Sequence, residues 1–192
     1  MKLTALAAIA GVLAMSVPIA FDEEGFADAL VSQERSPQIA EEDDIYAPLL
    51  GVWEVLAVDR LEDGSRYESR GEWYFARTLE GRAIQDVWIA PKRPRAAPTP
   101  GLPNRYGTTM RMFDRDSGQW RVVWFNPVSG AFNTLMGWGE NGQIIHEGVR
   151  DGQRIRWIFV EIGTDRFHWV GESEQADGVW VREVEFFGER RR

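Results

Sequence analysis

From Leu49 onward, tight-turn dipeptides recur along the chain and divide it into short segments. A Gly follows Asp, Ser or Asn at positions 63–64, 117–118, 129–130, 141–142, 151–152 and 177–178. Such pairs readily adopt the positive φ angles that short β-hairpin turns require. No stretch of this part of the chain keeps a 3.6-residue hydrophobic period for three turns, which disfavours helices. The pattern therefore predicts a succession of strands joined by short hairpins.

Ten strands are expected between these turns. Their approximate ranges are 50–60, 66–77, 81–90, 105–114, 119–126, 131–139, 143–150, 153–161, 165–174 and 179–187. A meander this long tends to close on itself, because closure removes the unpaired edges of an open sheet. We expect an all-β fold, namely an up-and-down antiparallel barrel of about ten strands preceded by an N-terminal leader and a short helix. A two-sheet sandwich is the alternative.

One connection differs from the others in its composition. Residues 91–103 hold five of the nine prolines and three basic residues. Because proline stiffens the backbone and cannot donate to a strand ladder, this stretch is predicted to be a long loop over one end of the barrel. It is either a plain surface excursion or a positively charged lid at the barrel mouth.

The first 46 residues differ from the rest in charge. They carry nine acidic and two basic side chains, whereas the net charge of the whole chain is −8. Most of the negative charge therefore belongs to this segment, and residues 47–192 are close to neutral. Residues 1–20 resemble a secretory signal behind Lys2, and Gly11 and Pro18 argue against a stable membrane span. Residues 21–46 are expected to be an acidic linker or short helix, and residues 47–192 the barrel domain. The protein would be periplasmic or secreted if the signal is cleaved, and cytoplasmic otherwise. A neutral body gives no support to nucleic-acid binding.

Strand alternation indicates which side chains point inward. The predicted interior is aromatic, with Trp73, Phe75, Trp124, Trp157, Phe159, Phe167, Trp169 and Trp180. The few polar residues on inward faces are Gln85, Asn126, Thr134, His146 and Arg182, whereas the facing of Arg111 is ambiguous. Aromatic walls with a few polar groups are typical of small-molecule pockets. The alternative is a filled core in which the polar groups bond to one another.

The facing of residues 81–90 has a direct consequence for assembly. With Gln85 inward beside Ala83, Val87 and Ile89, Trp88 points outward together with Asp86. An exposed tryptophan is typical of a subunit contact, so a homodimer through the Trp88 face is expected. With the opposite facing, Asp86 and Arg82 would be interior and would become catalytic candidates.

The composition excludes several kinds of chemistry. The chain has no Cys and two His, and it contains no nucleophile motif and no glycine-rich phosphate-binding motif. His146 and His168 are predicted on opposite faces, so we expect no metal site. A single inward His146 is compatible with a general base or a haem axial ligand. No cofactor is expected.

Several motifs together resemble a bacterial lipocalin-like (calycin-type) family of unknown function, over about residues 45–190. The first is Gly51-Val52-Trp53, like the G-x-W element with which calycins begin their first strand. The others are Gly81–Trp88, Tyr106–Arg111, Trp120–Gly130, Arg156–Phe159, Phe167–Trp169 and Trp180. The resemblance implies a barrel in which Arg182 stacks on Trp53, and a cytoplasmic location, because members commonly lack a leader. Nitrobindin is also similar, but its haem-site residues have no match here.

The sequence thus predicts a lipocalin-like protein that binds a small apolar or aromatic molecule inside the barrel. The expected ligand-binding residues are Trp73, Gln85, Arg111, Trp124, Asn126, His146, Trp157 and Trp169. An inward Arg111 would favour a ligand with a carboxylate or phenolate. The alternative function is a metal-independent isomerase, cyclase, lyase or hydratase, with His146 as the base and Arg111 as the electrostatic stabiliser.

Overall fold

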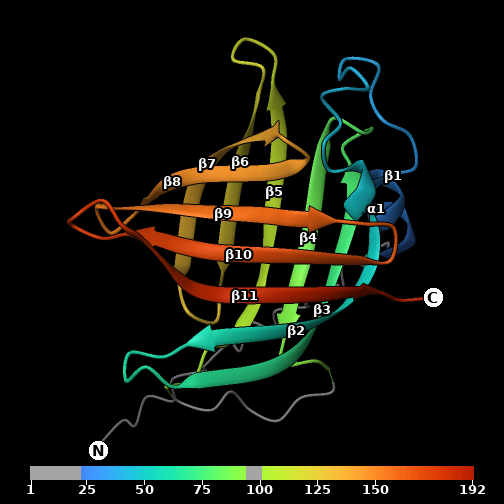
Figure 1. The fold of residues 1–192 in the computed structure, drawn as a ribbon. Helices are drawn as coiled ribbons and strands as arrows, with labels where there is room; N and C mark the ends of the chain where they lie inside the picture. The colour runs from blue at the N-terminus through green and yellow to red at the C-terminus, as the bar shows by residue number, and fades with distance from the viewer. Residues whose placement is uncertain (1–22, 94–100) are drawn as a thin grey trace, which may run out of the picture.

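The protein is an all-β barrel with one short helix in the described part of the chain (Figure 1). The computed structural model describes residues 23–93 and 101–192, so the predicted signal at 1–20 lies outside the described residues. The elements are α1 (Glu23–Leu30), β1 (Val31–Ser32), a 3-10 turn (Ala47–Leu49), β2 (Gly51–Arg60), β3 (Arg66–Thr78), β4 (Ala83–Ala90), β5 (Arg105–Asp114), β6 (Gln119–Asn126), β7 (Ala131–Glu140), β8 (Gln143–Arg150), β9 (Gln153–Ile162), β10 (Arg166–Glu174) and β11 (Trp180–Arg190).

Strands β2 to β11 form a closed antiparallel barrel. Each pairs with the next along the chain, and β11 pairs with β2 to complete the ring. The short β1 adds to the end of β3, opposite Arg77 and Thr78. The predicted up-and-down barrel of ten strands is therefore confirmed, and its strand limits differ from the predicted ones by only a few residues.

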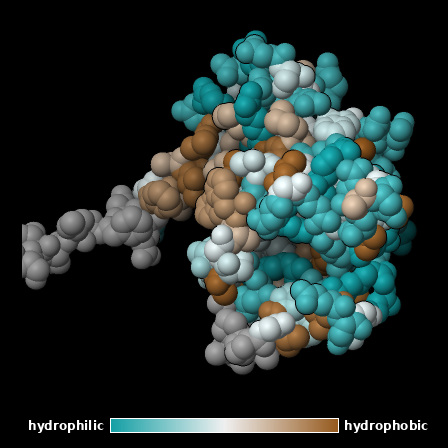
Figure 2. All heavy atoms as spheres, turned by 90° about the vertical axis from the view of Figure 1, so that its left-hand side faces the viewer, coloured by the Kyte–Doolittle hydropathy of each residue, from teal (hydrophilic) through white to brown (hydrophobic). Residues whose placement is uncertain are grey.

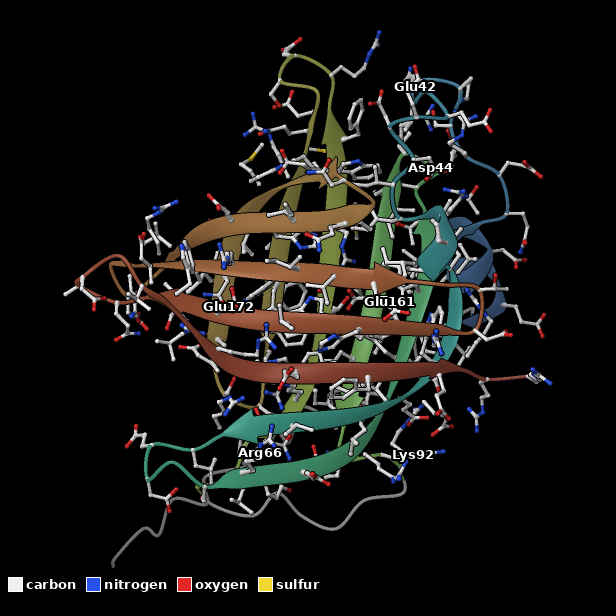
Figure 3. All side chains as sticks on the ribbon, in the orientation of Figure 1. Glu42, Asp44, Arg66, Lys92, Glu161 and Glu172 are labelled. Carbon is white, nitrogen blue, oxygen red and sulfur yellow. The ribbon has the colours of Figure 1, made fainter. Side chains whose placement is uncertain are left out.

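One end of the barrel is closed by residues 33–50, here named the closing segment. Three of its side chains, Ile39, Tyr46 and Leu49, are buried in the core of the barrel. Asp44 accepts two hydrogen bonds from Arg77 at 2.9 and 2.7 Å, while Glu42 stays exposed (Figure 3). This stretch includes much of the expected acidic linker. Its apolar side chains and the Asp44 ion pair hold it against the barrel instead of leaving it solvated.

The tryptophan of the G-x-W element lies at this closed end. Trp53 is fully buried, and its Nε1 donates to the carbonyl oxygen of Leu49 at 2.7 Å. The guanidinium of Arg190 stacks over the indole at 4.1 Å from the ring centroid, and Arg190 also donates to the carbonyl oxygens of Pro48 and Leu50. The expected cation–π contact therefore exists, but its arginine is Arg190 and the prediction of Arg182 is wrong.

A β-bulge explains why Arg182 was misplaced. Gly171 pairs with Val184 whereas Glu172 pairs with Arg182, so Glu183 is an extra residue in β11. The extra residue reverses the alternation on its N-terminal side. Arg182 bonds Glu172 and Glu185 on the outer wall, and Trp180 lies under the guanidinium of Arg156 there. The inward placement of Trp180 and Arg182 is corrected accordingly.

Candidate functional site

A cavity of about 520 Å³ lies inside the barrel and opens at the end opposite the closing segment. Its rim is formed by residues 101–105, the β6–β7 hairpin, and the ends of β8 and β11. Figure 2 views the molecule from the side of the β8–β9 and β10–β11 hairpins and shows a hollow surrounded mainly by hydrophilic residues. The volume falls in the range that small-molecule sites occupy.

The walls of the cavity are largely aromatic. The lining tryptophans are Trp73, Trp88, Trp124, Trp157 and Trp169. Trp73 stacks on Trp88 with ring centroids 5.2 Å apart, and Trp169 stacks on Phe186 at 4.3 Å. The structure thus places all four predicted tryptophans (Trp73, Trp124, Trp157 and Trp169) around the cavity. Their role in ligand binding stays a prediction.

Two glycines make room for these rings. A Cβ at Gly71 would lie 2.6 Å from Cη2 of Trp88, and a Cβ at Gly107 would lie 2.6 Å from Cη2 of Trp124. Real Cβ atoms essentially never approach another heavy atom so closely. An added Cβ would also clash with a backbone carbonyl oxygen, that of Ile89 at Gly71 and that of Phe125 at Gly107. A larger residue at either position would therefore displace both the neighbouring strand and the indole.

The predicted facing of residues 81–90 is wrong. Trp88 pairs with Trp73, and Asp86 pairs with Phe75, so the even positions of β4 share the inward face of β3. Gln85 instead shares its face with the exposed Val87, donates to Oγ1 of Thr108 at 3.1 Å, and does not line the cavity. The prediction failed because Val87 and Ile89 gave the outward face an apolar appearance.

The same correction removes the proposed subunit contact. Trp88 retains 2% of its exposed surface and lines the cavity. It is therefore not available to a second subunit, and the expected dimer face built on Trp88 is wrong.

Arg111 faces inward and forms a buried ion pair with Asp86. Its Nη2 donates to Oδ2 of Asp86 at 2.6 Å, and the two side chains retain 3% and 0% of their exposed surface. Asp86 Oδ1 also accepts the backbone N–H of Thr109 at 3.2 Å. The guanidinium carbon of Arg111 lies 5.0 Å from the ring centroid of Tyr46 and 5.4 Å from that of Phe75. Arg111 also belongs to the cavity lining. Its position beside aromatic rings resolves the ambiguity left by the sequence.

His146 lies at the inner end of the cavity with both ring nitrogens engaged. Nδ1 is 2.9 Å from the carbonyl oxygen of Trp157, and Nε2 is 2.8 Å from the hydroxyl of Tyr46. Because a carbonyl only accepts, Nδ1 carries the proton and Nε2 accepts from the tyrosine. Burial, reinforced by the charge of Arg111, lowers the pKa of His146 to about 3. Burial also raises the pKa of Tyr46, so both groups are neutral at pH 7.

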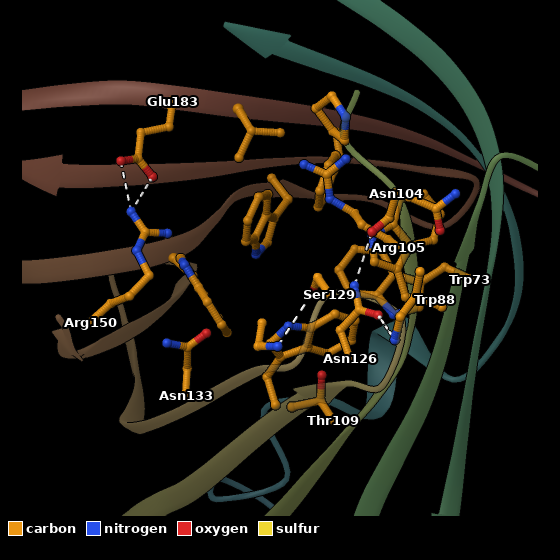
Figure 4. Close-up of a pocket in the computed structure, with 18 of the residues that line it drawn as sticks. Trp73, Trp88, Asn104, Arg105, Thr109, Asn126, Ser129, Asn133, Arg150 and Glu183 are labelled. Atoms are coloured by element: carbon orange, nitrogen blue, oxygen red, sulfur yellow. Dashed lines mark hydrogen bonds and ion pairs between the residues drawn. The ribbon is translucent and has the colours of Figure 1, made fainter. Parts of the chain in front are cut away.

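Asn126 supports the rim of the cavity. Its Nδ2 donates to the carbonyl oxygen of Asn104 at 3.0 Å, and its Oδ1 accepts the backbone N–H of Val128 at 3.0 Å (Figure 4). These bonds tie the segment after residue 100 to the β6–β7 hairpin. Asn126 was predicted as a ligand contact, and the structure places it on the lining with both amide atoms already bonded. The expected lid lies partly in residues 94–100, outside the described residues.

Charged side chains also reach the mouth. Both carboxylate oxygens of Glu183 accept Nη2 of Arg150 at 2.7 Å, and Arg150 comes from β8, which is not a neighbour of β11 (Figure 4). Arg105 pairs with Asp59, with one bond at 3.0 Å, and lies over the ring of Phe186.

The sequence reasoning missed Trp88, Arg105, Arg150 and Glu183 as lining residues. Glu183 enters the cavity wall because of the bulge, which the sequence does not reveal. Arg105 and Arg150 stand at strand ends, where alternation has little predictive value. The opposite facing of residues 81–90, which the sequence leaves open, places Trp88 inside.

Within residues 23–93 and 101–192, no group of three or more His, Cys, Asp or Glu side chains could hold a metal ion. In the same ranges, no helix is long and apolar enough to span a membrane.

Comparison with known proteins supports the fold. No family model and no curated protein matches the chain. Among solved structures it resembles Rv2717c from M. tuberculosis, with a TM-score of 0.55 and 15% identity over 80% of this chain and 99% of that one. It also resembles the S-type phycobiliprotein lyase CPES from Guillardia theta, with a TM-score of 0.53 and 10% identity over 78% of this chain and 92% of that one. At these identities the two similarities concern the fold alone, and they support a calycin-like barrel.

Proposed function

We propose that this protein binds a small, largely apolar or aromatic molecule inside the barrel. The observation that carries the proposal is the open cavity of about 520 Å³ with five tryptophans in its lining. A ten-stranded barrel is wide enough to leave such a space unfilled by its own side chains. Aromatic walls offer large contact areas to a ligand at low cost in side-chain entropy.

The chemistry of His146 favours binding over acid–base catalysis. A general base needs a free lone pair and a pKa near the working pH. Nε2 of His146 accepts the Tyr46 hydroxyl, and the pKa of about 3 leaves the ring a weak base. The second solved relative is a lyase by name, which is compatible with a small-molecule cavity, but at 10% identity it contributes only the fold to this argument.

Intrinsic tryptophan fluorescence tests the proposal directly. The protein would be titrated with decanoic acid, 2-naphthoic acid and geraniol, representing fatty acids, aromatic acids and terpenoids. At least one compound is expected to give a saturable quenching or spectral shift, because the cavity indoles lie within contact of any occupant. Calorimetry would separate true binding from absorption of the exciting light by the aromatic acid.

Two tryptophan variants provide the matched comparison. Trp157→Ala removes an indole from the cavity lining, whereas Trp180→Ala removes one from the outer wall. We expect the first to weaken binding about tenfold, by loss of buried aromatic contact, and the second to leave it unchanged. Absence of saturable binding by all three compounds would overturn the proposed function, as would equal weakening by both variants.

A further inference from the structure

Unpaired hydrogen-bond donors accumulate around the cavity. Among the described residues, Nε1 of Trp73, Nε1 of Trp88, and both Nε and Nη1 of Arg111 are buried and have no hydrogen-bond partner. All three residues belong to the cavity lining. An unpaired buried donor is costly, and native proteins rarely leave several in one place. The accumulation points to a missing acceptor.

Negatively charged acceptors are scarce in the same lining. Within the described ranges, the only side-chain oxygen of the lining that is buried and unpaired is Oδ1 of Asn104, at the rim. The single lining carboxylate, Glu183, is already bonded to Arg150. The carboxylates that neutralise Arg105 and Arg111, Asp59 and Asp86, are not among the lining residues. The charged groups of the lining are therefore the guanidiniums of Arg105 and Arg111, whose counter-ions lie outside it, and the Arg150–Glu183 pair.

Arg111 is also held in place before any ligand arrives. Asp86 fixes Nη2, and the rings of Tyr46 and Phe75 lie against the guanidinium. A guanidinium that is already oriented loses little freedom when it accepts a further partner. Nε and Nη1 lie on different edges of the guanidinium, so each can donate a single bond to a negatively charged oxygen, and charge-assisted bonds are the strongest that arginine makes.

From these contacts we infer that the ligand carries a carboxylate, received by Arg111 in the lining that also holds Trp73 and Trp88. The inference rests on the proposed function and narrows its ligand class to small apolar or aromatic acids. The apolar part of such a ligand would contact the other lining tryptophans, Trp124, Trp157 and Trp169.

Matched acid and amide pairs test this inference on the whole protein. Isothermal titration at pH 7 would compare decanoic acid with decanamide and 2-naphthoic acid with 2-naphthamide. The amides keep the size and shape of the acids but carry no charge. At least one acid is expected to bind at least about tenfold more tightly than its amide, since a hydrogen bond to a charged group is worth more than a neutral one.

A charge-neutral variant identifies the receiving arginine. Arg111→Gln alone leaves Asp86 buried without its partner, so the test uses the double variant Asp86→Asn/Arg111→Gln, with Arg121→Gln on the outer wall as the control. The double variant is expected to bring the acid-to-amide ratio below about two, while the control retains it. Circular dichroism would establish that both variants are folded. Thermal shifts on adding each compound to wild-type protein give a second readout, independent of the variants.

The outcomes separate the two proposals. If acids and amides bind the wild-type protein equally well, the carboxylate inference is overturned and the binding function stands. If the double variant keeps the acid preference, Arg111 is not the receiving group and the inference is overturned as well. If neither member of any pair binds, the carboxylate inference is overturned, and the proposed function fails with it when geraniol does not bind either.

Discussion

The buried tryptophans at the closed end of the barrel differ from those around the cavity in the hydrogen bonding of their indole N–H groups. At the closed end, the indole N–H groups of Trp53 and Trp120 donate to the carbonyl oxygens of Leu49 and Asp43 at 2.7 and 3.0 Å. Around the cavity, the indole N–H groups of Trp73 and Trp88 are buried and find no acceptor in the described part of the chain. All four rings retain 4% or less of their exposed surface. Burial alone therefore does not distinguish the two pairs, whereas hydrogen bonding does.

The difference separates structural tryptophans from candidate binding tryptophans. A satisfied indole packed under the closing segment contributes to folding in every state of the protein. An unsatisfied indole beside a cavity is destabilising until something bonds to it. The indole hydrogen bonds at the closed end thus add a stabilising contribution that the indoles of Trp73 and Trp88 lack.

The largest expected effect is at the closed end. Trp53→Ala removes a fully buried ring, its hydrogen bond to Leu49 and the stacked guanidinium of Arg190. We expect a loss of about 3–5 kcal/mol in the free energy of unfolding, measured in urea. Trp157→Ala, on the cavity wall, should cost less than about 2 kcal/mol, because its indole is only partly buried. Equal losses would contradict the distinction between the two ends.

Next in size is the buried ion pair of the cavity half. Asp86→Asn retains a side-chain oxygen for the N–H of Thr109 but leaves the charge of Arg111 without its counter-ion. The expected cost is about 2–3 kcal/mol by denaturant unfolding. Asp86→Asn/Arg111→Gln should recover part of this loss, because no buried charge remains. A double variant less stable than the single one would show that the pair is not the cause.

A smaller effect concerns pH. Because the pKa of His146 is about 3 in the folded protein and 6.5 ordinarily, the unfolded chain binds a proton between these values that the folded protein does not. The contribution of His146 to stability is complete above pH 6.5 and is lost as the pH falls towards 3. Stability should be about 2 kcal/mol lower at pH 5 than at pH 8 for this group alone.

The variant His146→Gln isolates this contribution. Between pH 6.5 and 5, its free energy of unfolding should fall less steeply with decreasing pH than that of the wild type. The difference in slope corresponds to about one proton taken up on unfolding. Above pH 7 the two curves should be parallel. Identical slopes in the acid window would contradict a buried neutral His146.

The smallest effect is expected at the mouth. Arg150 and Glu183 each retain 35% of their side-chain surface, so their ion pair is strongly solvated. Arg150→Gln should lower the stability by less than about 1 kcal/mol, seen as a small shift in Tm. A loss comparable to that of Trp53→Ala would mean that the mouth is as important to folding as the closed end.

Much of the fold was accessible from the sequence, because hairpin turns and strand alternation are local signals. The limits of β5, β6 and β8 agree with prediction to the residue. The failures are at places where alternation alone is insufficient. Gln85 and Trp88 were assigned to the wrong faces of β4, because both faces of this strand look apolar. Arg182 was assigned to the wrong face of β11 because of a β-bulge, which only the strand register reveals.

The candidate site was predictable in part, because strand alternation also indicates which side chains face the barrel interior. Seven of the eight expected lining residues surround the cavity, and Gln85 is the exception. The partner of Arg111 could not be predicted, since the wrong facing of β4 placed Asp86 outside. The role of Tyr46 was also out of reach. It comes from the closing segment, a hundred residues before His146, and no local pattern links the two.

The most direct test of the account follows the indole N–H groups themselves. Nitrogen-15 labelling of tryptophan, with assignment by single Trp→Phe variants, would resolve the indole signals in a two-dimensional NMR spectrum during titration with decanoic acid. The signals of Trp73 and Trp88 are predicted to shift on binding, while those of Trp53 and Trp120 stay in place. Shifts at Trp53 and Trp120 without shifts at Trp73 and Trp88, or no shift at saturating decanoic acid in any of the four, would contradict it.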